Sequence, residues 1–105
     1  MFRVQRSFSP GWNTVQIKDT AVVEYDNSPD ALRLGVVNHE SGYKIFLIFS
    51  DNTRLIKKLL DLVYDEYEEE VDEQDLVGLS LQISLVEKAG YLRINDIRAS
   101  DYEFD

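Results

Sequence analysis

Residues 79–94 read LSLQISLVEKAGYLRI, and this stretch decides the fold because two alternating runs flank one turn. Alternation of apolar and polar residues predicts β-strands with one buried face, so we expect a hairpin here. The turn falls at residues 87–90. Ile97 is out of phase with Asn95, and the second strand should therefore bend or end near Asp96. The residues expected to face the core are Leu79, Leu81, Ile83, Leu85, Leu92 and Ile94.

A long strand is expected near the start of the chain, after a turn signal at residues 9–11. Apolar residues alternate from Val15 onward, but the polar residue Asp19 interrupts the apolar face. Because one extra residue in a strand produces such a break, we expect a bulge or bend in the middle. A long, bent first strand can pair with two neighbours, which closing a small barrel requires. The predicted inward residues are Val15, Ile17, Ala21, Val23 and Tyr25.

A second hairpin is predicted between residues 32 and 49. Its first strand alternates through Leu32, Leu34 and Val36, and its turn contains a glycine. Its second strand, from residue 43 onward, is apolar on both faces apart from Lys44. The inward set is assigned to Ile45, Leu47 and Phe49, with the opposite phase left open.

One amphipathic helix is expected at about residues 52–67. Asp51 or Asn52 can cap it, because a short polar side chain accepts a hydrogen bond from the first free N–H groups. An acidic segment, residues 65–75, follows or extends the helix, and acids are unfavourable at the negative end of the helix dipole. We therefore expect fraying there. The apolar face comprises Leu55, Ile56, Leu59, Leu60, Val63 and Tyr67.

The residues for catalysis are missing from the sequence. The chain has 105 residues, the size of one domain, with no cysteine and a single histidine, His39, in a turn. It has no glycine-rich phosphate loop, no GxSxG element and no EF-hand spacing. We therefore predict a binding protein that is not an enzyme and has no catalytic residue, cofactor or metal site.

No hydrophobic stretch of the sequence suits a membrane. The N-terminal residues lack the apolar run of a signal peptide. No stretch reaches the roughly 18 apolar residues that a membrane span needs. We expect a cytoplasmic protein without a membrane partner, and the oligomeric state, including a homo-oligomer, is left open.

The net charge of −9 is concentrated in two segments. Residues 65–75 contain eight acids and no base, and residues 96–105 carry a net charge of −3. The remaining body is close to neutral. The total charge opposes non-specific adhesion to nucleic acid, but it is compatible with a local basic groove.

The predicted strands present a candidate face for single-stranded nucleic acid. Aromatic side chains that stack on bases, interleaved with cations that contact phosphates, are what such a groove needs. Ordinary surface decoration is the alternative, and Phe46 could instead belong to the core. The candidate residues are Trp12, Lys18, Arg33, Lys44, Phe46, Tyr91 and Arg93.

The C-terminal tail, residues 99–105, is a second candidate site. It mixes acids with Tyr102 and Phe104, and an aromatic side chain there can enter a partner pocket rimmed by Arg or Lys. The alternatives are a frayed terminus or a last strand that pairs with the sheet.

The order of three strands, one helix and two strands resembles the five-stranded OB barrel of single-stranded DNA-binding proteins. The likeness covers about residues 12–97, within a single domain at 1–98. The tail is similar to the acidic tips with which those proteins recruit replication partners. The resemblance implies single-stranded DNA as the ligand and a mainly β fold with one helix.

The chain is also similar to small OB-like phage and mobile-element proteins encoded beside primase or helicase genes. This resemblance implies an accessory of DNA replication or recombination. The alternative is a protein-interaction subunit of a primase, polymerase or helicase complex, and a DNA mimic ranks below both. The matching pieces are Val15-Gln16-Ile17, the helix start at residues 55–60, Asp75-Leu76-Val77-Gly78 and Gly90-Tyr91-Leu92-Arg93-Ile94.

Overall fold

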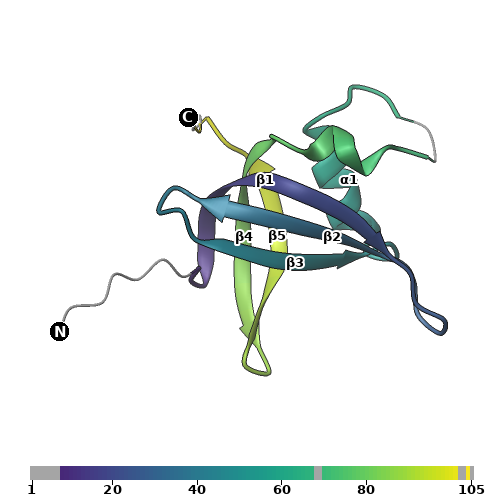
Figure 1. Ribbon diagram of the computed structural model, residues 1–105, viewed down its shortest axis with the longest axis horizontal. Helices are drawn as coiled ribbons and strands as arrows, with labels where there is room; N and C mark the ends of the chain where they lie inside the picture. The colour runs from purple at the N-terminus through teal and green to yellow at the C-terminus, as the bar shows by residue number, and fades with distance from the viewer. Residues whose placement is uncertain (1–7, 68–69, 102–103, 105) are drawn as a thin grey trace.

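Five antiparallel strands form one sheet in the order β3-β2-β1-β4-β5 (Figure 1). The computed structural model describes residues 8–67, 70–101 and 104. The predicted order of three strands, a helix and two strands is confirmed. Within the described residues no β-ladder joins the edge strands β3 and β5, so closure into a barrel is not confirmed. The elements are β1 (Gly11–Val23), β2 (Ala31–Asn38), β3 (Tyr43–Phe49), α1 (Thr53–Asp61), a 3-10 helix η1 (Glu73–Leu76), β4 (Ser80–Lys88) and β5 (Tyr91–Ala99).

The sheet is curled, so that β1, β2 and β3 lie across β4 and β5 in Figure 1. Strand β1 makes this possible because it pairs with β4 from Gly11 to Gln16 and with β2 from Val15 to Val23. The inner faces of all five strands then enclose one core together with α1. Fully buried residues at its centre include Val15, Ile17, Leu59, Leu81 and Ile83.

The predicted bulge in β1 is confirmed between Ile17 and Asp19. The backbone of Ile17 bonds to the segment before β4: its N–H donates to the carbonyl of Leu79 at 2.9 Å, and its carbonyl accepts from Gly78 N–H at 2.8 Å. Because the extra residue changes the phase of the strand, Thr20 is buried beyond the bulge. The predicted inward set is therefore wrong there: Ala21 and Val23 are half-buried, and Tyr25 is exposed.

Strand β3 has the opposite phase from the one assigned. Phe46 and Ile48 are buried, whereas Ile45, Leu47 and Phe49 are exposed, so the assigned inward set is wrong. The Phe46 ring packs edge-on against Phe8, with centroids 5.8 Å apart. Because the strand is apolar on both faces, alternation alone could not tell which set faces inward.

Helix α1 is shorter than the predicted residues 52–67. Of the two predicted N-cap candidates, Asn52 caps the helix, and its side chain accepts a hydrogen bond from Leu55 N–H at 3.4 Å. The helix ends at Asp61, ahead of the acidic segment, since negative charge is unfavourable at that end. The last residues of the acidic segment instead begin η1, whose Leu76 is buried. Three apolar residues of the helix, Leu55, Leu59 and Leu60, are buried in the core.

The structure confirms the β4–β5 hairpin that the alternating sequence predicted. Lys88 pairs with Tyr91 across a two-residue turn, in which Ala89 and Gly90 have φ of 54° and 82°. Two positive φ values are typical of a type I′ turn, which matches the twist of the flanking strands. Asn95 is the extra residue of a bulge, so β5 bends near the predicted position and continues to Ala99.

Candidate functional site

A row of four apolar side chains on β3 is exposed on the outer face of the sheet. Exposed apolar residues that lie next to one another often mark a binding surface. The ring of Phe49 extends the row because it lies 6.0 Å from the ring of Tyr25, centroid to centroid. Sequence analysis missed these residues as site candidates because three of them were assigned to the core. The β3 row consists of Tyr43, Ile45, Leu47 and Phe49, and these side chains are between 36% and 49% exposed.

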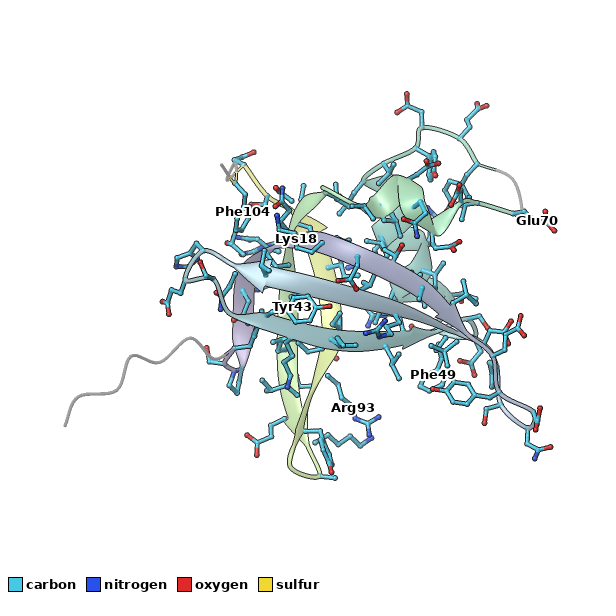
Figure 2. All side chains as sticks on the ribbon, viewed as in Figure 1. Lys18, Tyr43, Phe49, Glu70, Arg93 and Phe104 are labelled. Carbon is cyan, nitrogen blue, oxygen red and sulfur yellow. The ribbon has the colours of Figure 1, made fainter. Side chains whose placement is uncertain are left out.

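Tyr43 is fixed across the sheet by a hydrogen bond. Its hydroxyl donates to Asp19 Oδ2 at 2.7 Å, which joins β3 to β1 over the intervening strand β2. Gly35 of β2 lies beneath this contact, and a Cβ there would collide with the Tyr43 hydroxyl and the Asp19 carboxylate. Figure 2 looks onto this face and shows the Tyr43 ring over β2 and β3. The hydrogen bond to Asp19 raises the pKa of Tyr43, and the charge of Arg33 opposes this shift.

Arg33 lies on the same face as the β3 row. It pairs with Leu47 of β3, and residues directly opposite each other in an antiparallel pair project to the same side. It also pairs with Ala21 of β1. Of the predicted groove residues, Arg33 is thus placed among the side chains of the row.

Tyr91 and Arg93 of the other edge strand, β5, line the same pocket as residues of the β3 row. A pocket of about 530 Å³ lies between the two edge strands. Figure 2 shows Arg93 and Phe49 projecting on this side of β3. Polar groups at the start of α1, Asp51 and Asn52, also line the pocket. The other lining residues are Ile45, Phe46, Leu47, Ile48, Leu55, Leu92 and Ile94.

The remaining predicted groove residues are not part of the exposed β3 row. Phe46 is only 4% exposed, so its predicted outward position is wrong, since it fills the core next to Phe8. Lys44 lies 5.9 Å from the centroid of that ring. Trp12 belongs to the paired part of β1 and β4, where the guanidinium carbon of Arg98 lies 3.9 Å from its ring centroid.

Lys18 lies with the C-terminal tail. Together with His39 and Phe104 it lines a hollow of about 350 Å³ beside the turn after β2, and Figure 2 shows Phe104 next to Lys18. Phe104 is half-buried. Tyr102, the other predicted partner-binding residue, lies outside the described residues. The role of both aromatic residues in partner binding stays a prediction.

The acidic segment makes a defined hydrogen bond with Tyr64. The Tyr64 hydroxyl donates to Asp75 Oδ2 at 2.5 Å, and this hydrogen bond raises the pKa of Tyr64 to about 12. Among the described residues, no group of three or more His, Asp or Glu side chains is placed to hold a metal ion. The residues directly after the segment are structural, since Leu76 is buried and Gly78 N–H donates to the carbonyl of Ile17.

One signal in the sequence could have located the site. Gly35 interrupts a strand, and a glycine inside a strand often marks the close approach of another group. Here the approaching group is the Tyr43 side chain.

No protein-family model matches the chain, and no curated protein matches its sequence. In the part of the chain that the structure describes, no helix has the length and apolar character needed to cross a membrane.

Proposed function

We propose that this chain is a non-catalytic accessory of DNA replication or recombination in a phage or mobile element, and that it binds single-stranded DNA. The observation that carries the proposal is the combination of the exposed β3 row with Arg33 on one side and Tyr91 and Arg93 on the other. Aromatic and aliphatic groups can contact unstacked bases, while the guanidinium groups contact phosphates.

The strand order supports an OB fold whose β3–β5 seam is open. In this interpretation β1 is shared between two halves of the curled sheet, and α1 follows β3 and packs on the core near β5. The pocket at the seam then adjoins the β3 row, so that bound DNA can run from Tyr43 toward Arg93.

The distribution of charge supports local binding despite the net charge of −9. Figure 2 shows Glu70, in the acidic segment, on a loop that projects away from Tyr43 and Arg93. Glu70 also lines a hollow with Ser50, next to Phe49, so its charge opposes phosphate binding more at that end of the β3 row than at Tyr43 or Arg93, and salt screens it.

A titration of fluorescently labelled oligo-dT at low salt tests the proposal. We expect measurable binding with a strong salt dependence, and R33A and R93A should each weaken binding and reduce the salt slope by about 1. R98A is the matched control, because Arg98 is an arginine that lies on Trp12 instead. No binding by the parent chain at micromolar concentration in low salt would contradict the proposal.

A protein-interaction subunit of a primase, polymerase or helicase complex is the second candidate. It is favoured by Ile45 and Leu47, whose aliphatic side chains are exposed on an edge strand and suit a protein surface as well as a base. The substitutions I45S and L47S should then abolish capture of one of these enzymes, whereas R33A and R93A should leave capture intact. The reverse pattern would favour DNA binding.

A further inference from the structure

The bulge in β1 determines where Asp19 projects. Asp19 is two residues from Ile17, so in a regular strand both side chains would face the core. The extra residue at the bulge moves Asp19 to the position opposite Gly35, on the outer face. A carboxylate is thereby placed within hydrogen-bonding distance of a tyrosine from the strand beyond.

Three residues from three neighbouring strands thus act together. Asp19 anchors the tyrosine hydroxyl, and Gly35 leaves the space that this side chain occupies. Tyr43 nevertheless remains 49% exposed. The hydroxyl end of the side chain is therefore held against the sheet, while about half of the residue stays open to solvent.

We infer that Asp19 and Gly35 are positioning residues for the single-stranded DNA face, which hold Tyr43 across β2 so that a nucleobase can stack on its open side. This inference rests on the proposed function. An aromatic side chain that is already immobilised loses less conformational entropy on binding than one that rotates freely. The two residues act through Tyr43 and need no contact with DNA.

Removal of the Asp19 charge separates this role from simple electrostatics. If Asp19 were only an acid near bound phosphates, D19A would strengthen DNA binding, because like charge is removed. A positioning role predicts the opposite sign. We expect D19A to weaken binding roughly tenfold, within the range of one lost stacking contact.

Conservative and control variants complete the experiment with labelled oligo-dT. D19N retains an oxygen that accepts the hydrogen bond and should bind within about twofold of the parent chain, since it also loses the opposing charge. G35A should weaken binding as D19A does, because the added methyl group displaces the tyrosine. E24A removes a charge from an exposed residue of the β1–β2 connection and should not weaken binding.

Ring position is followed independently by NMR of the chain with labelled tyrosine. D19A and G35A should both shift the Tyr43 ring signals, and D19A should return the Tyr43 pKa toward its ordinary value. If the parent chain binds DNA and D19A binds equally or more tightly, the positioning role is overturned while the proposed function stands. If the parent chain binds no DNA, the proposed function fails, and the stacking role fails with it.

Discussion

Lys58 Nζ lies 2.5 Å from Asp96 Oδ1, and this ion pair joins α1 to the bulged part of β5. Arg54 strengthens the same junction, since its guanidinium donates to the carbonyl of Asn95 at 2.7 Å and lies 3.6 Å from Asp96. The bulge in β5 contains both acceptors of this junction, the backbone carbonyl of Asn95 and the side-chain carboxylate of Asp96. The junction therefore adds polar contacts to the buried apolar face that packs α1 against the sheet.

Acid should weaken this junction. The hydrogen bond from Lys58, and then that from the backbone N–H of Ile97, lower the pKa of Asp96 below its ordinary value. Its contribution to the free energy of unfolding is thus present above the ordinary pKa of an aspartate and is lost as pH falls through the lowered value. Urea unfolding should show D96N less stable than the parent chain at pH 7. A difference of the same size at pH values below the range of carboxylate titration would contradict this assignment.

Truncation of the buried helix face should be costly. Leu59 has no exposed surface, so L59A should lower the free energy of unfolding by about 2–5 kcal/mol, through lost burial and an unfilled cavity. I45A is the matched control on the exposed β3 row and should cost much less. Equal losses in urea unfolding would mean that β3 has the opposite phase.

Glycine in place of Ala89 should stabilise the β4–β5 turn. Ala89 has a φ of 54°, a left-handed conformation that strains residues with a Cβ. A89G should raise the free energy of unfolding by about 0.5 kcal/mol, because relief of this strain exceeds the added chain entropy. G78A should instead lower the free energy of unfolding. Gly78 has a φ of 93° and open space around it, so this loss should come from backbone conformation and not from a steric clash. Both changes can be measured by thermal unfolding.

The Tyr64–Asp75 contact predicts a late-titrating phenol. The hydrogen bond to Asp75 raises the pKa of Tyr64 to about 12. The stabilisation from this hydrogen bond is complete below the ordinary pKa of tyrosine and is lost as pH rises through the raised pKa of Tyr64. Tyrosinate absorbance in D75N should show one group that titrates earlier than in the parent chain. Y64F is the control and should remove this group altogether; an unchanged titration in D75N would show that the contact does not form.

Local patterns predicted the strands well, whereas contacts between distant residues escaped sequence analysis. The β4–β5 hairpin follows from alternation with one polar face, and the β1 bulge follows from Asp19 on an apolar face. The phase of β3 could not be predicted in this way because both of its faces are apolar. Nor could the Tyr43–Asp19 hydrogen bond, which depends on the combined register of three strands.

The edge of β3 also bears on how the chain behaves at high concentration. Within the described residues no strand pairs with its outer edge, and its outward side chains are apolar, which is the pattern by which sheets join edge to edge into aggregates. Charged residues that normally guard such an edge are sparse here. A net charge of −9 keeps copies apart through mutual repulsion. Residues 65–75, which contain eight acids and no base, supply most of this charge, so their repulsion opposes edge-to-edge association of β3 between copies of the chain.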